Sequence, residues 1–266
     1  MSAPTRNIPN KRVLLIVGIA LAALLVGWLS QYAATSGGDS QDDGAAATVE
    51  EDADSDQDGG SPQLAALERR DADDPLAMGD EDAPVVLIEY ADFACPFCGK
   101  FARDTEQKLI EKYVDEGVLR IEWRNFPVFG KDSERAARAA WAAGQQGRFW
   151  EFHEAAFADE DMIKKGYDKA RLTELAEEAG VRNMDRFHQD RQGEQARKAL
   201  ERDRQEAYQL GATSTPSFLV GGKPIAGAQP LSVFEDAVES AAAAAKDDGG
   251  DGGDGDGGDN GSGAGK

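Results

Sequence analysis

Cysteine and histidine are scarce in this sequence, since its 266 residues contain only two of each. A structural zinc site takes four ligands in paired spacings. His153 and His188 form no such pair with Cys95 and Cys98. The composition therefore argues against a zinc centre, and we expect no metal and no bound cofactor.

Positive charge is also sparse, with 29 Lys and Arg against 50 Asp and Glu. Residues 35–84 carry sixteen acidic and two basic side chains, and residues 246–266 carry six and two. The part between them, residues 85–245, has a net charge of only −6. No basic patch is present, which argues against nucleic acid binding.

The flanking segments have almost no large apolar residues and cannot bury enough surface to fold. We expect an acidic disordered linker over 35–70 and a disordered Gly/Asp tail over 246–266. Within the linker, Asp54–Gly59 (DSDQDG) resembles the first half of a calcium loop, but the twelfth position is Ala65 where such a loop has Glu. A solvated tether is the favoured interpretation.

A single long apolar run, VLLIVGIALAALLVGWL, extends from Val13 to Leu29 and follows three basic residues. Its seventeen residues span roughly 25 Å as a helix. We predict a transmembrane anchor over 13–34, a cytoplasmic N-terminus over 1–12, and an extracytoplasmic chain beyond it. A cleaved signal peptide is the alternative, although no small-residue cleavage motif follows at the usual distance. A lipoprotein is excluded because no cysteine lies near the end of the run.

The central part alternates between strand and helix patterns. Val85–Tyr90 (VVLIEY) predicts a central strand, a helix follows from Pro96 to about Tyr113, and Gly117–Trp123 predicts a second, parallel strand. Helical periodicity then continues over about 131–210. A hairpin around Gly221 and Gly222 and a closing helix complete the pattern. This order predicts an α/β domain over 71–245 with a helical insertion.

The two cysteines stand in the motif Cys95-Pro96-Phe97-Cys98. Proline is favoured at the first helical position, so Cys95 falls at the helix N-cap, where unpaired N–H groups and the helix dipole stabilise a thiolate. Cys98 lies one turn further and is expected to be more buried. This arrangement favours thiol–disulfide exchange over the alternatives, a zinc site or a static structural disulfide.

Glu89 interrupts the first apolar strand, six residues before Cys95. An unpaired carboxylate inside a strand covered on both faces is costly. The residue is therefore either a functional acid beneath the cysteine pair or a solvent-facing strand residue. The aromatic residues around His153 are expected to form a packed helix, and His188 is expected at the surface.

Two segments in this order, VVLIEYADFACPFCGKF and GATSTPSFLVGGKPIAGAQP, resemble the DsbA-like branch of the thioredoxin superfamily, specifically its membrane-anchored, actinobacterial-type Gram-positive members. The resemblance covers roughly Asp74 to Ala241, including the helical insertion. It implies a thioredoxin fold with an inserted helical subdomain after a single N-terminal transmembrane helix.

The resemblance also implies roles for individual residues. Cys95 matches the solvent-facing nucleophile and Cys98 its buried partner, while Glu89 matches a buried acid that exchanges a proton with Cys98. Thr215-Pro216 matches a dipeptide with a cis bond whose backbone pairs with an extended substrate. With Pro96 and Phe97, this dipeptide is expected to contact the substrate.

By this resemblance, the protein is expected to be a membrane-tethered oxidase that forms disulfides in secreted proteins and is reoxidised by a membrane partner of the vitamin K epoxide reductase type. It is expected to be a monomer. The best-known oxidising member has His at the position of Phe97 and Val at that of Thr215, so a somewhat less oxidising pair is expected here. A reductase or isomerase on the same fold, or a non-catalytic peptide-binding module, are the alternatives.

Overall fold

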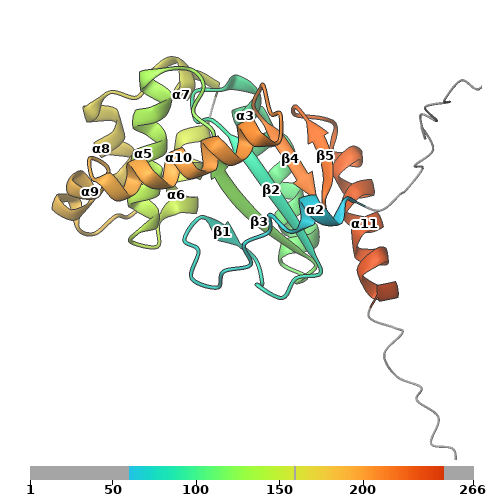
Figure 1. Cartoon of the computed structure of the whole chain (residues 1–266). Coiled ribbons are helices and arrows are strands. Elements are labelled where there is room, and N and C mark those ends of the chain that lie inside the picture. Colours follow the sequence, from blue (N-terminus) through green and yellow to red (C-terminus); the bar gives the residue numbers. More distant parts are fainter. Residues whose placement is uncertain (1–59, 159, 249–266) are drawn as a thin grey trace, which may run out of the picture. The chain divides into compact units, whose positions relative to one another are not determined.

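The computed structural model describes residues 60–158 and 160–248 (Figure 1). The predicted anchor, most of the linker with its Asp54–Gly59 motif, and residues 249–266 of the tail lie outside the described residues. Within the described ranges, no helix combines the length and the apolar character that a membrane span requires.

The described elements follow the predicted alternation of strands and helices. In chain order they are α2 (Pro62–Ala65), β1 (Ala77–Met78), β2 (Val85–Ala91), α3 (Pro96–Phe101), the π-helical segment η1 (Ala102–Glu106), α4 (Gln107–Leu109), the π-helical segment η2 (Ile110–Val114), β3 (Leu119–Asn125), α5 (Lys131–Gly144), α6 (Phe149–Phe157), α7 (Glu160–Lys164), α8 (Lys169–Glu178), α9 (Met184–Asp190), α10 (Glu194–Gln209), β4 (Ser217–Val220), β5 (Lys223–Ala226) and α11 (Leu231–Asp248). The closing helix thus extends into the segment predicted as tail.

The sheet has the strand order β1-β3-β2-β4-β5. β2 and β3 are parallel, as predicted, and the helical stretch from α3 to η2 connects them. β4 and β5 form the predicted hairpin through Gly221 and Gly222, whose φ angles are +53° and +78°. A Cβ at Gly221 would lie 2.6 Å from the Cβ of Ala241 on α11, so this turn packs directly against the closing helix.

One face of the sheet carries an apolar core and the other a buried charge network. On the first face, Leu87, Ile121 and Val220 pack with apolar residues of the helical stretch after Pro96 and of α11. The helical insertion, α5 to α10, adds a core of its own that is continuous with the cysteine pair. The predicted α/β fold with a helical insertion is therefore confirmed.

The opposite face of β3 presents Arg120, Glu122 and Arg124, which are at most 3% exposed. The Glu122 carboxylate accepts hydrogen bonds from Arg124 at 2.6 Å and from Arg120 at 3.2 Å. Helix α10, which crosses in front of the sheet in Figure 1, supplies Glu206, which accepts from Arg124 at 3.2 Å. Each of these buried charges therefore has a partner, as burial requires.

The prediction that the disordered linker extends to residue 70 is wrong for residues 60–70. This segment contains α2, and Leu67 packs on the sheet. The backbone N–H groups of Arg69 and Arg70 donate to the Glu122 carboxylate at 3.0 and 2.8 Å. The segment is ordered because the buried carboxylate of β3 needs these donors, a requirement that local composition does not reveal.

Candidate active site

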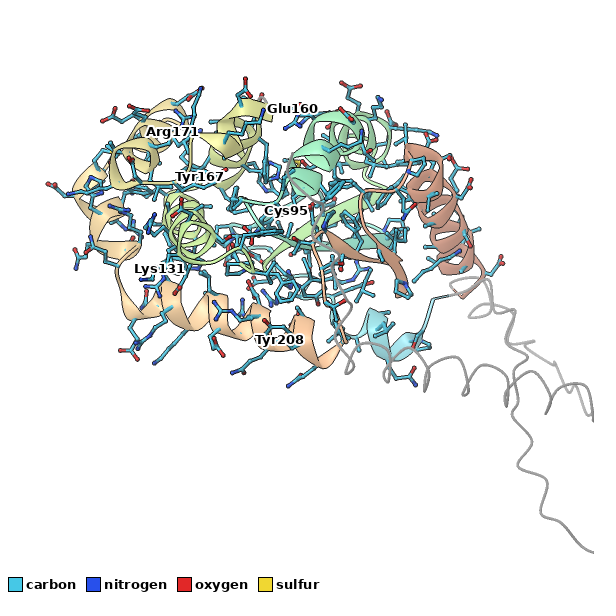
Figure 2. The ribbon with its side chains drawn as sticks, turned by 90° about the horizontal axis from the view of Figure 1, so that it is seen from above. Cys95, Lys131, Glu160, Tyr167, Arg171 and Tyr208 are labelled. Atoms are coloured by element: carbon cyan, nitrogen blue, oxygen red, sulfur yellow. The ribbon has the colours of Figure 1, made fainter. Side chains whose placement is uncertain are left out.

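The cysteine pair lies where β2 ends and α3 begins, and Figure 2 shows Cys95 between the helical insertion and the half of the molecule that carries α11. Cys95 is the N-cap of α3 with extended backbone angles (φ −85°, ψ 120°), and Pro96 occupies the first helical turn, as predicted. Both cysteines are free thiols. The helix start at Pro96 thus places the Cys95 sulfur at the positive end of the helix.

The Thr215–Pro216 loop covers Cys95. The Thr215–Pro216 peptide bond is cis, as the resemblance implied, and the Cys95 thiol donates a hydrogen bond to the Thr215 carbonyl oxygen at 3.2 Å. The expectation of a solvent-facing Cys95 is wrong for this state, since only 1% of the residue is exposed. The exposed surface at the pair comes from Pro96 and from Phe97, which is 63% exposed.

The two thiols have opposite environments. A hydrogen bond from Cys98 lowers the pKa of Cys95 to about 6, against the opposing effect of burial, and backbone N–H groups of the first helical turn add to the lowering. Burial raises the pKa of Cys98 well above its usual range, and the neighbouring Cys95 and Glu89 raise it further. The pair can therefore hold one thiolate and one thiol at neutral pH, which suits an attacked sulfur that is also a good leaving group.

We expect the thiolate absorbance of the reduced protein to titrate with a midpoint near pH 6. Because the folded pKa lies below the unfolded value of about 8.5, ionisation of Cys95 stabilises the reduced fold. This contribution to the free energy of unfolding is fully present above the unfolded pKa and is lost as pH falls through the folded pKa. Between the two pKa values it changes by about 1.4 kcal/mol per pH unit. The oxidised protein lacks this dependence and serves as the control. A midpoint near pH 8.5 would contradict the assignment.

Glu89 lies in β2, paired in register with Trp123 on one side and Phe218 on the other. Its side chain is 1% exposed, so the solvent-facing alternative is excluded, and its Oε2 atom has no hydrogen-bond partner among the described residues. Burial raises the pKa of Glu89 well above its usual range, and the neighbouring Glu106 carboxyl raises it further. Glu89 is therefore suited to carry a proton near Cys98.

Sequence reasoning missed two acidic residues at the site. Asp92 fixes the loop after β2, because its Oδ2 atom accepts hydrogen bonds from the backbone of Val128 (2.7 Å) and the hydroxyl of Ser133 (2.8 Å), and its own N–H contacts the Cys98 sulfur at 3.5 Å. Glu106 is fully buried in η1. A signal for Glu106 was present, since Cys98, Ala102 and Glu106 follow at steps of four residues and so share one helical face.

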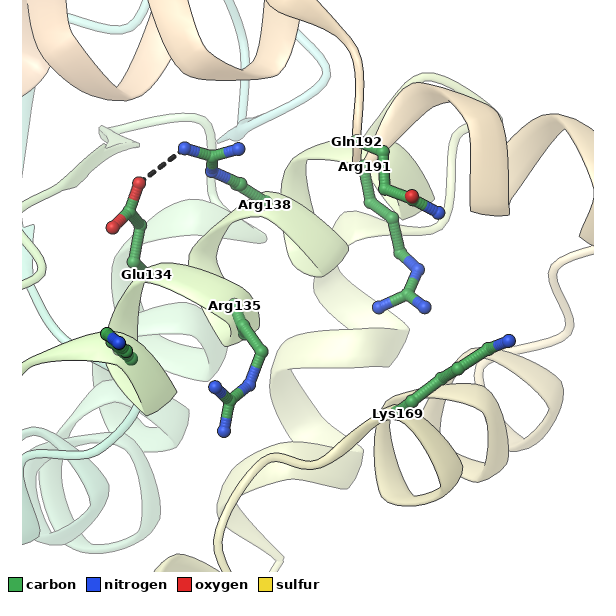
Figure 3. Close-up of a pocket in the computed structure, with 7 residues that line it drawn as sticks. Glu134, Arg135, Arg138, Lys169, Arg191 and Gln192 are labelled. Atoms are coloured by element: carbon green, nitrogen blue, oxygen red, sulfur yellow. Dashed lines mark hydrogen bonds and ion pairs between the residues drawn. The ribbon is translucent and has the colours of Figure 1, made fainter.

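Two surface hollows were not predicted. A cavity of about 250 Å³ adjoins the cysteine pair and is lined by Pro96, Phe97, Lys100, Arg103, Glu160 and Lys164. A cavity of about 530 Å³ lies on the helical insertion, lined by α5, α8 and the segment after α9 (Figure 3). Five of its seven lining residues are Lys or Arg, and its Glu134 pairs with Arg138. No residue of the Cys95–Cys98 motif lines this second cavity.

Comparison with known proteins identifies the fold family. A family model described as "Thioredoxin" matches residues 71–240. The chain is 33% identical over 178 residues to the Na(+)/H(+) antiporter NhaA 3 of Salinispora tropica, covering 66% of this chain and 26% of the antiporter. It is 27% identical over 150 residues to the probable disulfide bond formation protein D of Bacillus anthracis, covering 55% of this chain and 69% of that protein. The chain spans only about a quarter of the length of its antiporter relatives.

Solved structures agree with this match. BdbD from Bacillus subtilis, in its oxidised form, superposes with a TM-score of 0.59 at 24% identity, over 63% of this chain and 92% of that one. A thioredoxin-like oxidoreductase from Silicibacter pomeroyi gives 0.57 at 25% identity, over 68% and 98%. The family match covers well over half of the chain, the solved structures share its fold, and the cysteine pair lies at the start of α3: this chain belongs to the thioredoxin family.

Proposed function

We propose that the protein is an extracytoplasmic oxidase that transfers its Cys95–Cys98 disulfide to secreted proteins. The observation that carries the proposal is the asymmetry of the pair, in which Cys95 has a pKa of about 6 and Cys98 a raised one. A stabilised Cys95 thiolate stabilises the reduced form of the pair, and an enzyme whose reduced form is stabilised oxidises its substrates. The likeness to disulfide bond formation protein D supports the same direction.

The reaction proceeds in two exchanges. A substrate thiolate attacks the Cys95 sulfur, forming a mixed disulfide and breaking the Cys95–Cys98 bond. Cys98 leaves with the electron pair and takes a proton from the buried acid at Glu89. A second substrate thiolate then attacks the substrate sulfur of the mixed disulfide, and Cys95 departs as a thiolate. Two electrons pass from the substrate dithiol to the protein.

The substrate and the setting are proposed together. Exposed Pro96 and Phe97 and the backbone at Thr215 and Pro216 would hold an extended substrate segment beside Cys95. Residues 13–34 would tether the domain, and a membrane partner of the vitamin K epoxide reductase type would reoxidise it, with the protein acting as a monomer. The match to the antiporters covers a small part of those proteins, so we propose no transport activity.

A single-turnover assay tests the direction of exchange. We expect the oxidised chain to convert a reduced two-cysteine peptide to its disulfide with one disulfide transferred per chain. The chemically reduced chain, mixed with the same peptide in its disulfide form, provides the reverse reaction. A faster reverse reaction would replace the oxidase by a reductase on the same fold.

A further inference from the structure

A second buried carboxyl group accompanies Glu89. Glu106, at the end of η1, is 1% exposed, and neither of its carboxyl oxygens has a hydrogen-bond partner among the described residues. An unpaired buried acid in the helix that carries the nucleophile is costly to keep. The mechanism above uses Glu89 and leaves Glu106 without a role.

The two acids face the same region behind the cysteine pair. Glu89 is paired in register with Trp123, so both side chains point to one face of the sheet. The Trp123 ring lies 5.2 Å from the ring of His153, whose Nε2 atom lies 3.7 Å from Glu106 Oε2. Glu106 and Trp123 thus both lie beside His153, and the Glu89 and Glu106 carboxyl groups are close enough to interact directly.

In the part of the chain that the structure describes, no basic side chain neutralises this pair of acids. The titratable groups that face Glu106 are Glu89 from β2 and His153 from α6, and the cysteine pair in turn faces Glu89. Within the described ranges no Lys or Arg forms an ion pair with either acid. Burial lowers the pKa of His153 to about 3, so its imidazole is neutral. Burial raises the pKa of Glu106 as well. Two carboxyl groups that share a buried site cannot both ionise at neutral pH.

We propose that Glu106 is a positioning residue that keeps a proton on Glu89 for delivery to the departing Cys98 sulfur. The inference deepens the proposed function and rests on it. When the Cys95–Cys98 bond breaks, Cys98 leaves with the electron pair and the Glu89 proton moves to its sulfur, so the two acids together lose one proton. The pair keeps its other proton, so only one of the two acids is negatively charged.

The proton that Glu89 gives up must be replaced from solvent. His153 borders a surface cavity of about 410 Å³ that is also lined by Arg103, Gln107 and Glu154. Its neutral imidazole, with Nε2 turned to Glu106, stands between that cavity and the acids. A proton from solvent can therefore restore the fully protonated pair before the next substrate reacts.

The Glu106→Gln variant of the full chain tests the inference through the pH profile of single-turnover oxidation of a dithiol peptide. Without the neighbouring acid, Glu89 loses its proton at lower pH, so the limb on which the rate falls with rising pH should move down by about one pH unit or more. Glu154→Gln, which removes an acid lining the cavity on the same helix as His153, should leave the profile unchanged. Should the Gln variant fail to fold, Glu106→Met also lacks the acid and carries the same test.

The outcomes separate this inference from the proposed function. An active Glu106→Gln variant with the wild-type pH profile would overturn the role of Glu106 and leave the proposed oxidase function intact. If Glu106 had a purely structural role, its replacement would lower the denaturation midpoint but leave the pH profile of oxidation unchanged. That result would also overturn the inference. If the wild-type chain transferred no disulfide at any pH, the proposed function and this inference would fall together.

Discussion

Replacing Cys95 by serine should abolish thiol–disulfide exchange altogether, because no disulfide can then form for a substrate thiolate to attack and the one remaining cysteine, Cys98, is buried. The effect should exceed that of any other single substitution at the site. The measurement is the single-turnover oxidation of a dithiol peptide, with circular dichroism to confirm that the variant is folded.

The Cys98→Ser variant is the matched control for this loss. Given the peptide in its disulfide form, the Cys95 thiolate of this variant attacks one peptide sulfur and displaces the other as a thiolate. Because the variant has no second cysteine to resolve the mixed disulfide, it should accumulate as a covalent adduct with the peptide through Cys95. Binding of a thiol-free version of the peptide should persist in both variants. Residual exchange in Cys95→Ser would contradict the assignment of the nucleophile. Unchanged biological activity of that variant would favour the peptide-binding module instead.

Replacing Glu122 by alanine should destabilise the fold by about 3–5 kcal/mol, because it leaves the buried Arg120 without a carboxylate partner and the buried Arg124 with Glu206 alone. The Glu122 carboxylate bonds Arg120 and Arg124 and accepts the backbone N–H groups of Arg69 and Arg70. The free energy of unfolding by chemical denaturation measures the loss.

Glu194→Ala is the control, since Glu194 pairs with Lys198 on the exposed surface of α10 and such pairs contribute little. The loss for Glu122→Ala should be similar in the oxidised and reduced proteins, because the network lies on the sheet face opposite Glu89 and Trp123. If Glu122→Ala lowered the free energy of unfolding as little as Glu194→Ala does, water would have to reach the charge network, and its burial would be contradicted.

Sequence reasoning succeeded where local chemistry determines structure. Proline after Cys95 determined the helix start, and the apolar run around Glu89 determined the central strand, although it left open whether Glu89 is buried or faces solvent. It failed where a residue's environment is assembled from distant segments. The order of residues 60–70 depends on Glu122, more than fifty residues away.

The same limit applies to the site. Asp92 has its partners in the segment that follows β3, and Glu106 becomes a buried neighbour of Glu89 only when the helix packs on the sheet. The burial of Cys95 depends on the Thr215 carbonyl, which folding brings from the far end of the domain. The contacts of Asp92 and of Cys95 have no local sequence pattern, whereas Glu106 has one, because it follows Cys98 in steps of four residues on one helical face.

The reduction potential of the Cys95–Cys98 pair tests the central claim most directly, by equilibration of the purified chain with reduced and oxidised glutathione. A low pKa for Cys95 stabilises the reduced form, and Phe97 adds no hydrogen bond to it, so we expect a value of about −120 to −180 mV, within the range of disulfide donors. A value of about −270 mV, as in thioredoxin, would mean that the reduced protein is the working form and would contradict the proposed oxidase function.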